Sequence, residues 1–291
     1  MKGTIVKGIA GFYFVRSDDG DVIRCRARGI FKKDGVTPFV GDRVEYSVNQ
    51  DGDGNVDRIL PRKNEFRRPP VANVDQIVIV AAAKDPDPSF GLIDRFTAEA
   101  ERFDADILIC INKCDLADAG ELETITGNYD GVYPVVMLSA KNGSGIAELE
   151  AKLAGRISAL AGPSGAGKST ILNLLQRDEK METGNVSDKT GRGRHTTRHA
   201  ELFELPAGGM VFDTPGFTSF DVTEATEEEL AGLFPDIAAY AGRCRYDNCR
   251  HLKEPGCAVR EAVREGGVHR ERYRSYAAQL LAIREREKNR Y

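Results

Sequence analysis

The sequence contains no long apolar segment. No run approaches the roughly 18 residues that a membrane-spanning helix needs, and Lys2, Lys7 and Arg16 interrupt the apolar stretch at the N-terminus. We therefore expect no transmembrane helix and no membrane partner, and we interpret the protein as cytoplasmic.

The sequence also lacks an excess of positive charge. Its 41 Lys and Arg residues stand against 45 Asp and Glu residues, so the formal net charge is -4. This balance argues against a uniformly basic nucleic-acid-binding protein, although basic residues can still gather locally. With 291 residues, 41% hydrophobic and 30% charged, the chain is long enough for two or three globular domains.

Cysteine is scarce, and its placement favours a metal site over disulfide bonds. Of six cysteines, Cys244, Cys249 and Cys257 lie close together, and with His251 they form the pattern Cys-x₄-Cys-x-His-x₅-Cys. Three thiolates and one imidazole are a full tetrahedral ligand set. We expect one structural Zn²⁺ in a C-terminal helical domain, residues 223–291, and chance clustering of buried cysteines is the alternative.

The end of the chain, residues 264–291, has the pattern of an amphipathic helix. Its apolar positions predict one packed face, and its Arg and Lys residues predict one basic face. The apolar positions are Tyr273, Tyr276, Ala277, Leu280, Leu281 and Ile283. A packed helix with a solvated face is the simplest interpretation, and an RNA contact is the alternative.

The segment Gly162–Ser169 matches the phosphate-binding pattern G-x-x-x-x-G-K-[ST], between an apolar run from Ile157 and a helical pattern over Thr170–Leu175. Glycines let backbone N–H groups surround a polyphosphate, Lys168 supplies a positive charge, and Ser169 offers a hydroxyl to Mg²⁺. A glycine-rich turn is the alternative. The predicted nucleotide-binding residues here are Gly162, Pro163, Ser164, Gly165, Ala166, Gly167, Lys168, Ser169 and Thr170.

Residues 1–65 alternate apolar and polar positions in short runs separated by turn signals, which indicates a small barrel, most simply an OB-fold. Residues 1–70 contain 14 basic and 10 acidic side chains. Arg24, Arg26 and Arg28 recur at a period of two, so they share one strand face. That face is a predicted RNA surface, with a solvated face as the alternative. Residues 64–70 are expected to be a linker, and the barrel domain is assigned to residues 1–68.

From Val71 onward, apolar strands alternate with helical segments, which predicts an α/β domain over residues 69–222. Asn112-Lys113-Cys114-Asp115 and Ser139-Ala140-Lys141 each follow an apolar strand. The Asp115 carboxylate can accept hydrogen bonds from guanine N1–H and its exocyclic amine. Lys113 can lay its aliphatic stem along the base, and the backbone of 139–141 can bond guanine O6. With the phosphate loop, these segments predict guanine binding through Asn112, Lys113, Asp115, Ser139, Ala140 and Lys141.

Two further segments are expected to sense the γ-phosphate. Residues 187–199 are polar and glycine-rich, and we favour Thr197 over Thr196 as a Mg²⁺ ligand in this switch. A strand over 209–212 leads into Asp213-Thr214-Pro215-Gly216, which should bring Asp213 near the metal and the Gly216 N–H near the γ-phosphate.

No glutamine occurs from Asp213 to Ala225, where many GTPases have a residue that orients the attacking water. His195 is therefore the predicted catalytic residue, with Arg194 and Arg198 as the other polar candidates. An exposed loop histidine is the alternative interpretation. The base-recognition segments precede the phosphate loop, so the order is that of a circularly permuted GTPase opened just after the second switch.

In this combination of motifs the sequence resembles the RsgA family (also called YjeQ or YloQ), circularly permuted GTPases that depend on the small ribosomal subunit. The resemblance covers essentially the whole chain. It implies an OB-fold barrel, a permuted P-loop GTPase domain and a zinc domain. It also implies GTP hydrolysis to GDP and phosphate, stimulated by the 30S subunit and its 16S rRNA, in late subunit maturation. The family's Arg-His-Thr-Thr motif maps its histidine to His195, and its metal ligands map to Cys244, Cys249, His251 and Cys257.

We expect a monomer that uses Mg²⁺ with GTP. A GTP-gated binding module, in which hydrolysis is incidental, is the second interpretation. A kinase that uses the phosphate loop is the third, and it lacks an evident acceptor site. Because the second switch leads directly into the zinc domain, we hypothesise that the nucleotide state moves or orders that domain through residues 217–260.

Overall fold

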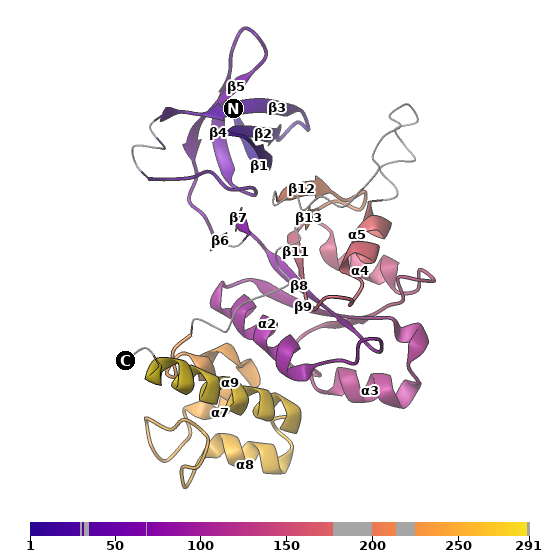
Figure 1. Ribbon diagram of the computed structural model, residues 1–291, viewed down its shortest axis with the longest axis vertical. Helices are drawn as coiled ribbons and strands as arrows, with labels where there is room; N and C mark the ends of the chain where they lie inside the picture. Colours follow the sequence, from indigo (N-terminus) through magenta and orange to yellow (C-terminus); the bar gives the residue numbers. More distant parts are fainter. Residues whose placement is uncertain (30, 32–34, 68, 177–199, 214–224, 290–291) are drawn as a thin grey trace. The chain divides into compact units, whose positions relative to one another are not determined.

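The computed structural model describes residues 1–29, 31, 35–67, 69–176, 200–213 and 225–289 (Figure 1). The chain forms two compact units. The first comprises Met1–Gln76, Ala147–Leu160 and Ser169–Phe217, and the second comprises Ile77–Ile146, Ala161–Lys168 and Thr218–Tyr291. Both units contain part of the predicted GTPase domain.

The first unit begins with a closed five-stranded barrel. Its neighbours pair in the order β1-β2-β3-β5-β4, and β4 returns to pair with β1. The pairs are antiparallel apart from β3 and β5, which are parallel. This OB-like barrel confirms the prediction for the N-terminal segment. Its strands are β1 Lys2–Ile9, β2 Phe12–Ser17, β3 Val22–Ala27, β4 Arg43–Val48 and β5 Gly54–Ile59.

The predicted linker at residues 64–70 is wrong. A short hairpin is present there, formed by β6 Glu65–Arg67 and β7 Pro70–Ala72. The buried Asn64 amide holds it in place, because Asn64 Nδ2 donates to Val74 O at 2.8 Å and Asn64 Oδ1 accepts from Val74 N–H at 2.9 Å. Phe66 is also buried. The arginines and prolines of this segment suggested a linker, but the alternation of Phe66 and Val71 with polar neighbours gives the hairpin a buried face.

The same unit continues into the second half of the GTPase domain. Strand β11 Ile157–Ala161 pairs in parallel with β13 Met210–Asp213, and β13 pairs antiparallel with β12 Glu201–Glu204. Strand β12 in turn pairs with β1, and Lys7 Nζ lies 2.9 Å from Glu201 Oε1. The barrel is therefore joined by backbone pairing and an ion pair to the strand that follows residues 187–199. Helices α4 Ile146–Leu153 and α5 Lys168–Leu175 flank β11 in the sequence.

The second unit contains the strands and helices that carry the predicted guanine segments. Strands β8 Gln76–Ala82, β9 Asp106–Asn112 and β10 Val135–Met137 lie side by side in the order β10-β9-β8, and β10 and β9 are parallel. Strand β8 is buried along its whole length, as expected for a strand covered on both faces. The helices between these strands are α2 Phe90–Arg102, the short η1 Cys114–Leu116 and α3 Ala119–Gly127.

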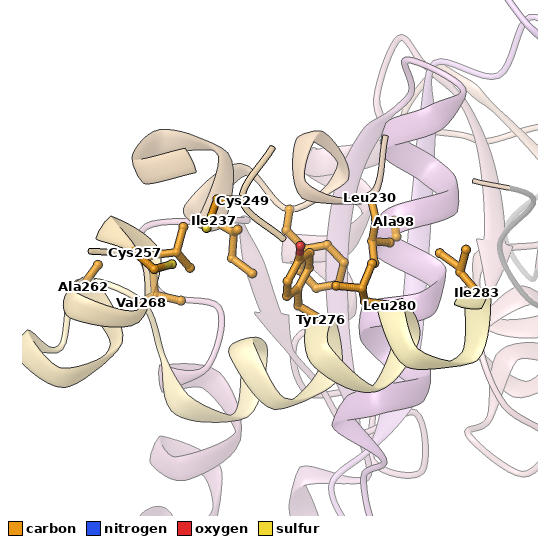
Figure 2. Packing of buried hydrophobic residues seen from close by; sticks show 12 residues of the cluster. Ala98, Leu230, Ile237, Cys249, Cys257, Ala262, Val268, Tyr276, Leu280 and Ile283 are labelled. Carbon is orange, nitrogen blue, oxygen red and sulfur yellow. The ribbon is translucent and has the colours of Figure 1, made fainter. Parts of the chain in front are cut away.

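The C-terminal helices of the second unit enclose a buried cluster that also includes Ala98 of α2 (Figure 2). Phe234 and Tyr276 pack edge to face within it, with ring centroids 5.5 Å apart. Two of the metal-pattern cysteines, Cys249 and Cys257, belong to the same cluster. The helices are η2 Leu230–Leu233, α7 Pro235–Ala241, α8 Ala258–Glu265 and α9 Arg270–Lys288.

The amphipathic segment at the end of the chain differs from its prediction in two ways. It is interrupted at Gly266, which caps α8 in the left-handed region with φ 83°, and α9 begins at Arg270. Leu281 was expected on the packed face but is 55% exposed, whereas Arg272 is 1% exposed. At about 100° per residue, a helix that buries Tyr276, Leu280 and Ile283 also buries position 272 and turns position 281 outward. In the described part of the chain, no helix has the length and apolar character needed to cross a membrane.

Candidate nucleotide site and metal centre

The phosphate loop follows β11, and its two outer glycines have no room for a side chain. Gly162 has φ 133°, and a Cβ there would lie 2.1 Å from Val80 O of β8. Gly167 has φ 96°, and a Cβ there would lie 2.2 Å from Asn112 Nδ2. The loop can therefore approach β8 and β9 closely only with glycine at both positions.

Lys168 extends back over its own loop. Its Nζ donates to Gly162 O and to Pro163 O, both at 2.7 Å. The side chain is half-buried, and burial lowers the pKa of Lys168. An anionic phosphate within the loop would counter that effect by stabilising the ammonium group.

Asn112 connects three segments of the site. Its Nδ2 donates to Ala166 O of the phosphate loop at 2.8 Å. Its Oδ1 accepts from Lys113 N–H at 2.8 Å and from Ala140 N–H at 3.0 Å. The side chain is 2% exposed, so these bonds form away from water. One buried amide thus fixes the phosphate loop against both base-recognition segments.

The two base-recognition segments are also joined directly. Ser139 Oγ donates to Asp115 Oδ1 at 2.6 Å, and Cys114 N–H donates to Leu138 O at 3.1 Å. Ser139 is buried and Asp115 is exposed, so the carboxylate keeps an open side for a ligand. Lys113 adopts a left-handed conformation with φ 62°, and its ammonium group bonds Asp85 O. Lys141 at the end of the segment is exposed.

The remaining predicted nucleotide residues lie in the first unit or outside the described residues. Ser169 and Thr170 are exposed in the first turn of α5. Asp213 is the last residue of β13, opposite Glu201 in the antiparallel register, and is partly buried. His195, Thr197 and Gly216 lie outside the residues that the structure describes.

The four residues of the cysteine–histidine pattern converge on one point. Their ligand atoms all lie within 4.8 Å of one another. Cys244 Sγ lies 3.9 Å from Cys257 Sγ, and each of these sulfurs lies 3.5 Å from His251 Nδ1. Zn–S bonds of about 2.3 Å and a Zn–N bond of about 2.0 Å at tetrahedral angles require separations of about 3.8 Å and 3.5 Å. The arrangement therefore fits a tetrahedral metal ion.

Burial favours the neutral form of two ligands in the cluster. It raises the pKa of the Cys249 thiol to about 12 and lowers the pKa of His251, which favours the neutral imidazole that metal ligation needs. A bound cation would stabilise the Cys249 thiolate and would therefore lower the pKa of this thiol again.

The loop between the metal ligands is held by residues that the sequence pattern did not identify. The Glu254 carboxylate accepts backbone N–H bonds from Arg250 at 3.0 Å and from Leu252 and Lys253 at 2.8 Å. Burial alone would raise the pKa of Glu254, but the backbone hydrogen bonds outweigh it and lower this pKa to about 2. Tyr273 Oη donates to His251 O at 2.7 Å. The sequence signal that could have indicated this role is the position of Glu254 between two of the metal ligands. A loop between clustered ligands exposes several backbone N–H groups, and a carboxylate can accept hydrogen bonds from them.

Comparison with known proteins identifies the family. The model of the family described as RsgA GTPase matches residues 59–223, and that described as the RsgA N-terminal domain matches residues 2–56. The chain belongs to the RsgA GTPase family. The relatives named "Small ribosomal subunit biogenesis GTPase RsgA" include a protein of Caldanaerobacter subterraneus and one of Ruminiclostridium cellulolyticum. The first is 45% identical to this chain, and the match covers 100% of this chain and 98% of that protein. The second is 44% identical, and the match covers 97% of this chain and 94% of that protein.

Two solved structures of RsgA-type proteins resemble the chain over nearly its full length. YjeQ from Thermotoga maritima has a TM-score of 0.85 and 36% identity, covering 97% of this chain and 98% of that one. YloQ, described as a circularly permuted GTPase, has a TM-score of 0.84 and 38% identity, covering 98% and 95%. The permuted motif order predicted from the sequence agrees with this membership.

The basic face of the barrel is less positive than the sequence suggested. Arg24 and Arg26 are exposed on β3, but Arg24 forms two hydrogen bonds with Asp53, at 3.0 and 2.6 Å. Beyond the end of the strand, Arg28 lies 2.7 Å from Asp57. The Arg26 guanidinium lies 4.8 Å from the centre of the Phe12 ring. The exposed Arg26 cation, stacked on this half-buried aromatic ring, remains available to a nucleobase or phosphate.

Proposed function

We propose that this chain hydrolyses GTP to GDP and phosphate while it acts in the assembly of the small ribosomal subunit. The observation that carries the proposal is the Asn112 connection, which holds a phosphate loop against two guanine-type segments in a chain of the RsgA GTPase family. A nucleotide bound there would have its base and its phosphates fixed by one buried side chain. This arrangement favours a guanine nucleotide over a generic phosphate ligand.

Guanine selection is assigned to Asp115, Lys113 and the segment 139–141. The open side of the Asp115 carboxylate would accept the two guanine donors, and Ser139 Oγ fixes its other side through a 2.6 Å bond. Adenine offers no such donor pair and would leave the carboxylate unpaired. The rigid Ser139–Asp115 pair therefore supports base selection rather than simple anion binding.

Hydrolysis is assigned to His195, which would orient the attacking water once its segment closes over the nucleotide. Lys168 and the loop N–H groups would bind the phosphates, and Asp213 and Gly216 would contact the metal and γ-phosphate region. Mg²⁺, when bound, neutralises charge on the phosphates. Ser169 and Thr197 are its proposed ligands, and the exposed Ser169 hydroxyl at the start of α5 is of the right chemical type.

The metal of the cysteine–histidine cluster is proposed to be one structural Zn²⁺. Three sulfurs and one imidazole nitrogen whose ligand atoms lie within 4.8 Å of one another favour zinc over the oxygen-seeking Mg²⁺ or Ca²⁺. The four protein ligands leave no open position for a substrate, so the ion would stabilise the C-terminal helices.

The proposed partners are the 30S subunit with its 16S rRNA, together with GTP and GDP. The barrel face around Arg26 and Phe12 and the zinc domain are the proposed docking elements, on a monomeric cytoplasmic protein. The proposed domains remain 1–68, 69–222 and 223–291.

A histidine substitution separates an enzyme from a GTP-gated binding module. His195→Ala should lower kcat by orders of magnitude while GTP affinity is retained. His269→Ala is the matched control, because His269 is exposed and accepts from Glu271 N–H at the start of α9. An unchanged kcat in His195→Ala would favour the gated module. Equal losses in both variants would overturn the assignment of His195.

A further inference from the structure

The loop that follows strand β8 binds the first base-recognition segment at its beginning. This loop, residues 83–89, leads from β8 to α2. Ala83 N–H donates to Asn112 O at 2.8 Å, and the ammonium group of Lys113 donates to Asp85 O. All of these residues belong to the second unit. The start of the base-recognition segment is therefore attached to this loop at two consecutive positions.

Lys84 of the same loop binds the residue that lies beyond the other end of the segment. Its Nζ donates to both carboxylate oxygens of Glu121, each at 2.7 Å. Glu121 also accepts from Asp118 N–H at 2.9 Å, as part of the capping box at the start of α3. Asp115 lies between these attachment points in the sequence. The stretch that carries the Asp115 carboxylate is thus attached at both ends to three consecutive residues of one loop.

The ion pair between Lys84 and Glu121 is exposed to solvent. The hydrogen bond between them lowers the pKa of Glu121 and raises the pKa of Lys84, so both groups stay charged at neutral pH. The two side chains are 40% and 41% exposed. An exposed ion pair adds little to the free energy of unfolding, so its removal should leave the fold intact. A small free energy is nevertheless enough to shift the population of a loop between two positions.

The loop also approaches the phosphate-binding segment. A Cβ on Gly165 would lie 3.5 Å from Pro86 Cδ, which is an ordinary van der Waals distance. Residues 83–86 therefore border both the part of the site assigned to the base and the part assigned to the phosphates. A change in the position of this loop would reach the nucleotide and would not stay confined to the surface.

We propose that Lys84 is a positioning residue for guanine binding, because its ion pair with Glu121 holds the base-recognition segment where the Asp115 carboxylate meets both guanine donors. This inference rests on the proposed guanine site. In this role Lys84 acts through Glu121 rather than on the nucleotide. Without the ion pair, the segment occupies its binding-competent position for a smaller fraction of the time, and the nucleotide affinity falls by that fraction.

Equilibrium binding of GDP and of inosine diphosphate to the full-length chain tests the proposal. Inosine diphosphate lacks the exocyclic amine of guanine, so it meets the Asp115 carboxylate through N1–H alone. Lys84→Met removes the charge and keeps a side chain of similar length. It should weaken GDP binding about threefold to fivefold and inosine diphosphate binding less than about twofold, because only GDP needs both carboxylate bonds. The preference for GDP should therefore fall.

Two further variants show whether the ion pair acts as a unit. Glu121→Gln removes the other charge, while its amide oxygen can still accept from Asp118 N–H. It should reproduce the effect of Lys84→Met, and the double variant should weaken GDP binding no more than either single variant does. Lys84→Arg keeps the positive charge and should retain GDP affinity within about twofold.

Arg264→Met is the matched control. It breaks an exposed ion pair with Glu261 on α8, also in the second unit, and should leave the affinities for GDP and inosine diphosphate unchanged. The melting temperatures of Lys84→Met and of the control should both stay near that of the unsubstituted chain.

Unchanged GDP affinity in Lys84→Met, or an equal loss of affinity for both nucleotides, would overturn the role of Lys84 and leave the guanine site standing. Additive losses in the double variant would also overturn it, because Lys84 and Glu121 would then act separately. If the unsubstituted chain fails to bind GDP, the guanine site itself is wrong and the role of Lys84 falls with it.

Discussion

The side chain of Asn112 donates to the backbone carbonyl of Ala166 at 2.8 Å, across 54 positions of sequence. Asn112 ends a strand of the base-recognition half, and Ala166 lies within the phosphate loop. In a permuted chain the base segments are made first, and this bond attaches the later phosphate loop to them. Nucleotide affinity should therefore depend on Asn112 even though its amide faces protein backbone.

Asn112→Ala should weaken GTP and GDP to a similar degree, by about tenfold to a hundredfold, because buried N–H and C=O groups of three segments lose their partner. The measurement is equilibrium binding of both nucleotides. Asn128→Ala is the matched control, since Asn128 is equally buried and bonds Thr124 O at 2.9 Å away from the site. Nucleotide affinity that is unchanged in Asn112→Ala, or equally reduced in both variants, would contradict this account of Asn112.

Asp115→Asn should exchange the base preference of the site. The amide places its NH2 group against the exocyclic amine of guanine, so GTP binding should weaken, while xanthosine triphosphate, which has a carbonyl oxygen at that position, should bind better. Binding of both nucleotides checks the prediction. Asp118→Asn serves as the control, because Asp118 caps α3 by accepting from Glu121 N–H at 2.9 Å. It should keep the preference for GTP, and undiminished GTP binding by Asp115→Asn would remove the guanine assignment.

Loss of the metal should unfold the C-terminal helices. Cys249 and Cys257 lie in the same buried cluster as Tyr276 and Leu280, so the ligand loop and the helix core stabilise each other. Cys249→Ser should lose bound zinc, and hydrogen exchange over residues 225–289 should accelerate. Cys114→Ser should keep zinc, since Cys114 Sγ bonds Ile111 O outside the cluster. Full zinc content in Cys249→Ser would contradict the proposed site.

Among the charged residues of the second unit, Arg272 should be the one whose substitution lowers the free energy of unfolding most. It lies 2.7 Å from Asp94 and 2.7 Å from Asp236, and it is 1% exposed. Arg272→Met leaves both carboxylates without their cation and should cost about 3–5 kcal/mol of unfolding free energy. Arg274→Met, on the exposed side of the same helix, should cost about 0.5 kcal/mol or less. Denaturant unfolding of both variants provides the comparison.

The loss of unfolding free energy in Arg272→Met should depend on pH in a defined direction. Burial raises the pKa of Asp94, and Arg272 opposes that rise, so removing the arginine raises this pKa further. A carboxyl whose pKa is higher in the folded state than in the unfolded chain adds stability as the pH falls. The loss should therefore be smaller at about pH 5 than at about pH 8. A larger loss at the lower pH would rule out this role of Asp94.

The motifs predicted the chemistry of the site better than its connections. Spacing alone identified the phosphate-loop pattern, the segments proposed to bind guanine and the cysteine–histidine cluster, because each pattern depends on residues close in sequence. The three bonds of Asn112 and the pairing of β1 with β12 join segments far apart, and no local pattern reports them. His195 and the two switches remain predictions, since His195, Thr197 and Gly216 lie outside the described residues.

Charge was the least predictable property. Arg272 appeared in the sequence as one of many arginines on a basic helix, and its burial depends on Asp94, which lies 178 positions earlier. Arg24 and Arg28 were correctly placed on a polar surface, but Asp53 and Asp57 compensate them from a neighbouring part of the barrel. Sequence periodicity predicts on which face of a helix or strand a residue lies, whereas the identity of its ion-pair partner depends on the tertiary fold.

The rate of GTP hydrolysis with and without purified small ribosomal subunits tests the central claim most directly. The account predicts slow hydrolysis by the chain alone and a rate that rises by orders of magnitude with subunits, since the bound subunit would position His195 against the attacking water. The same subunits should not stimulate His195→Ala. A hydrolysis rate that small subunits leave unchanged would contradict the proposed function.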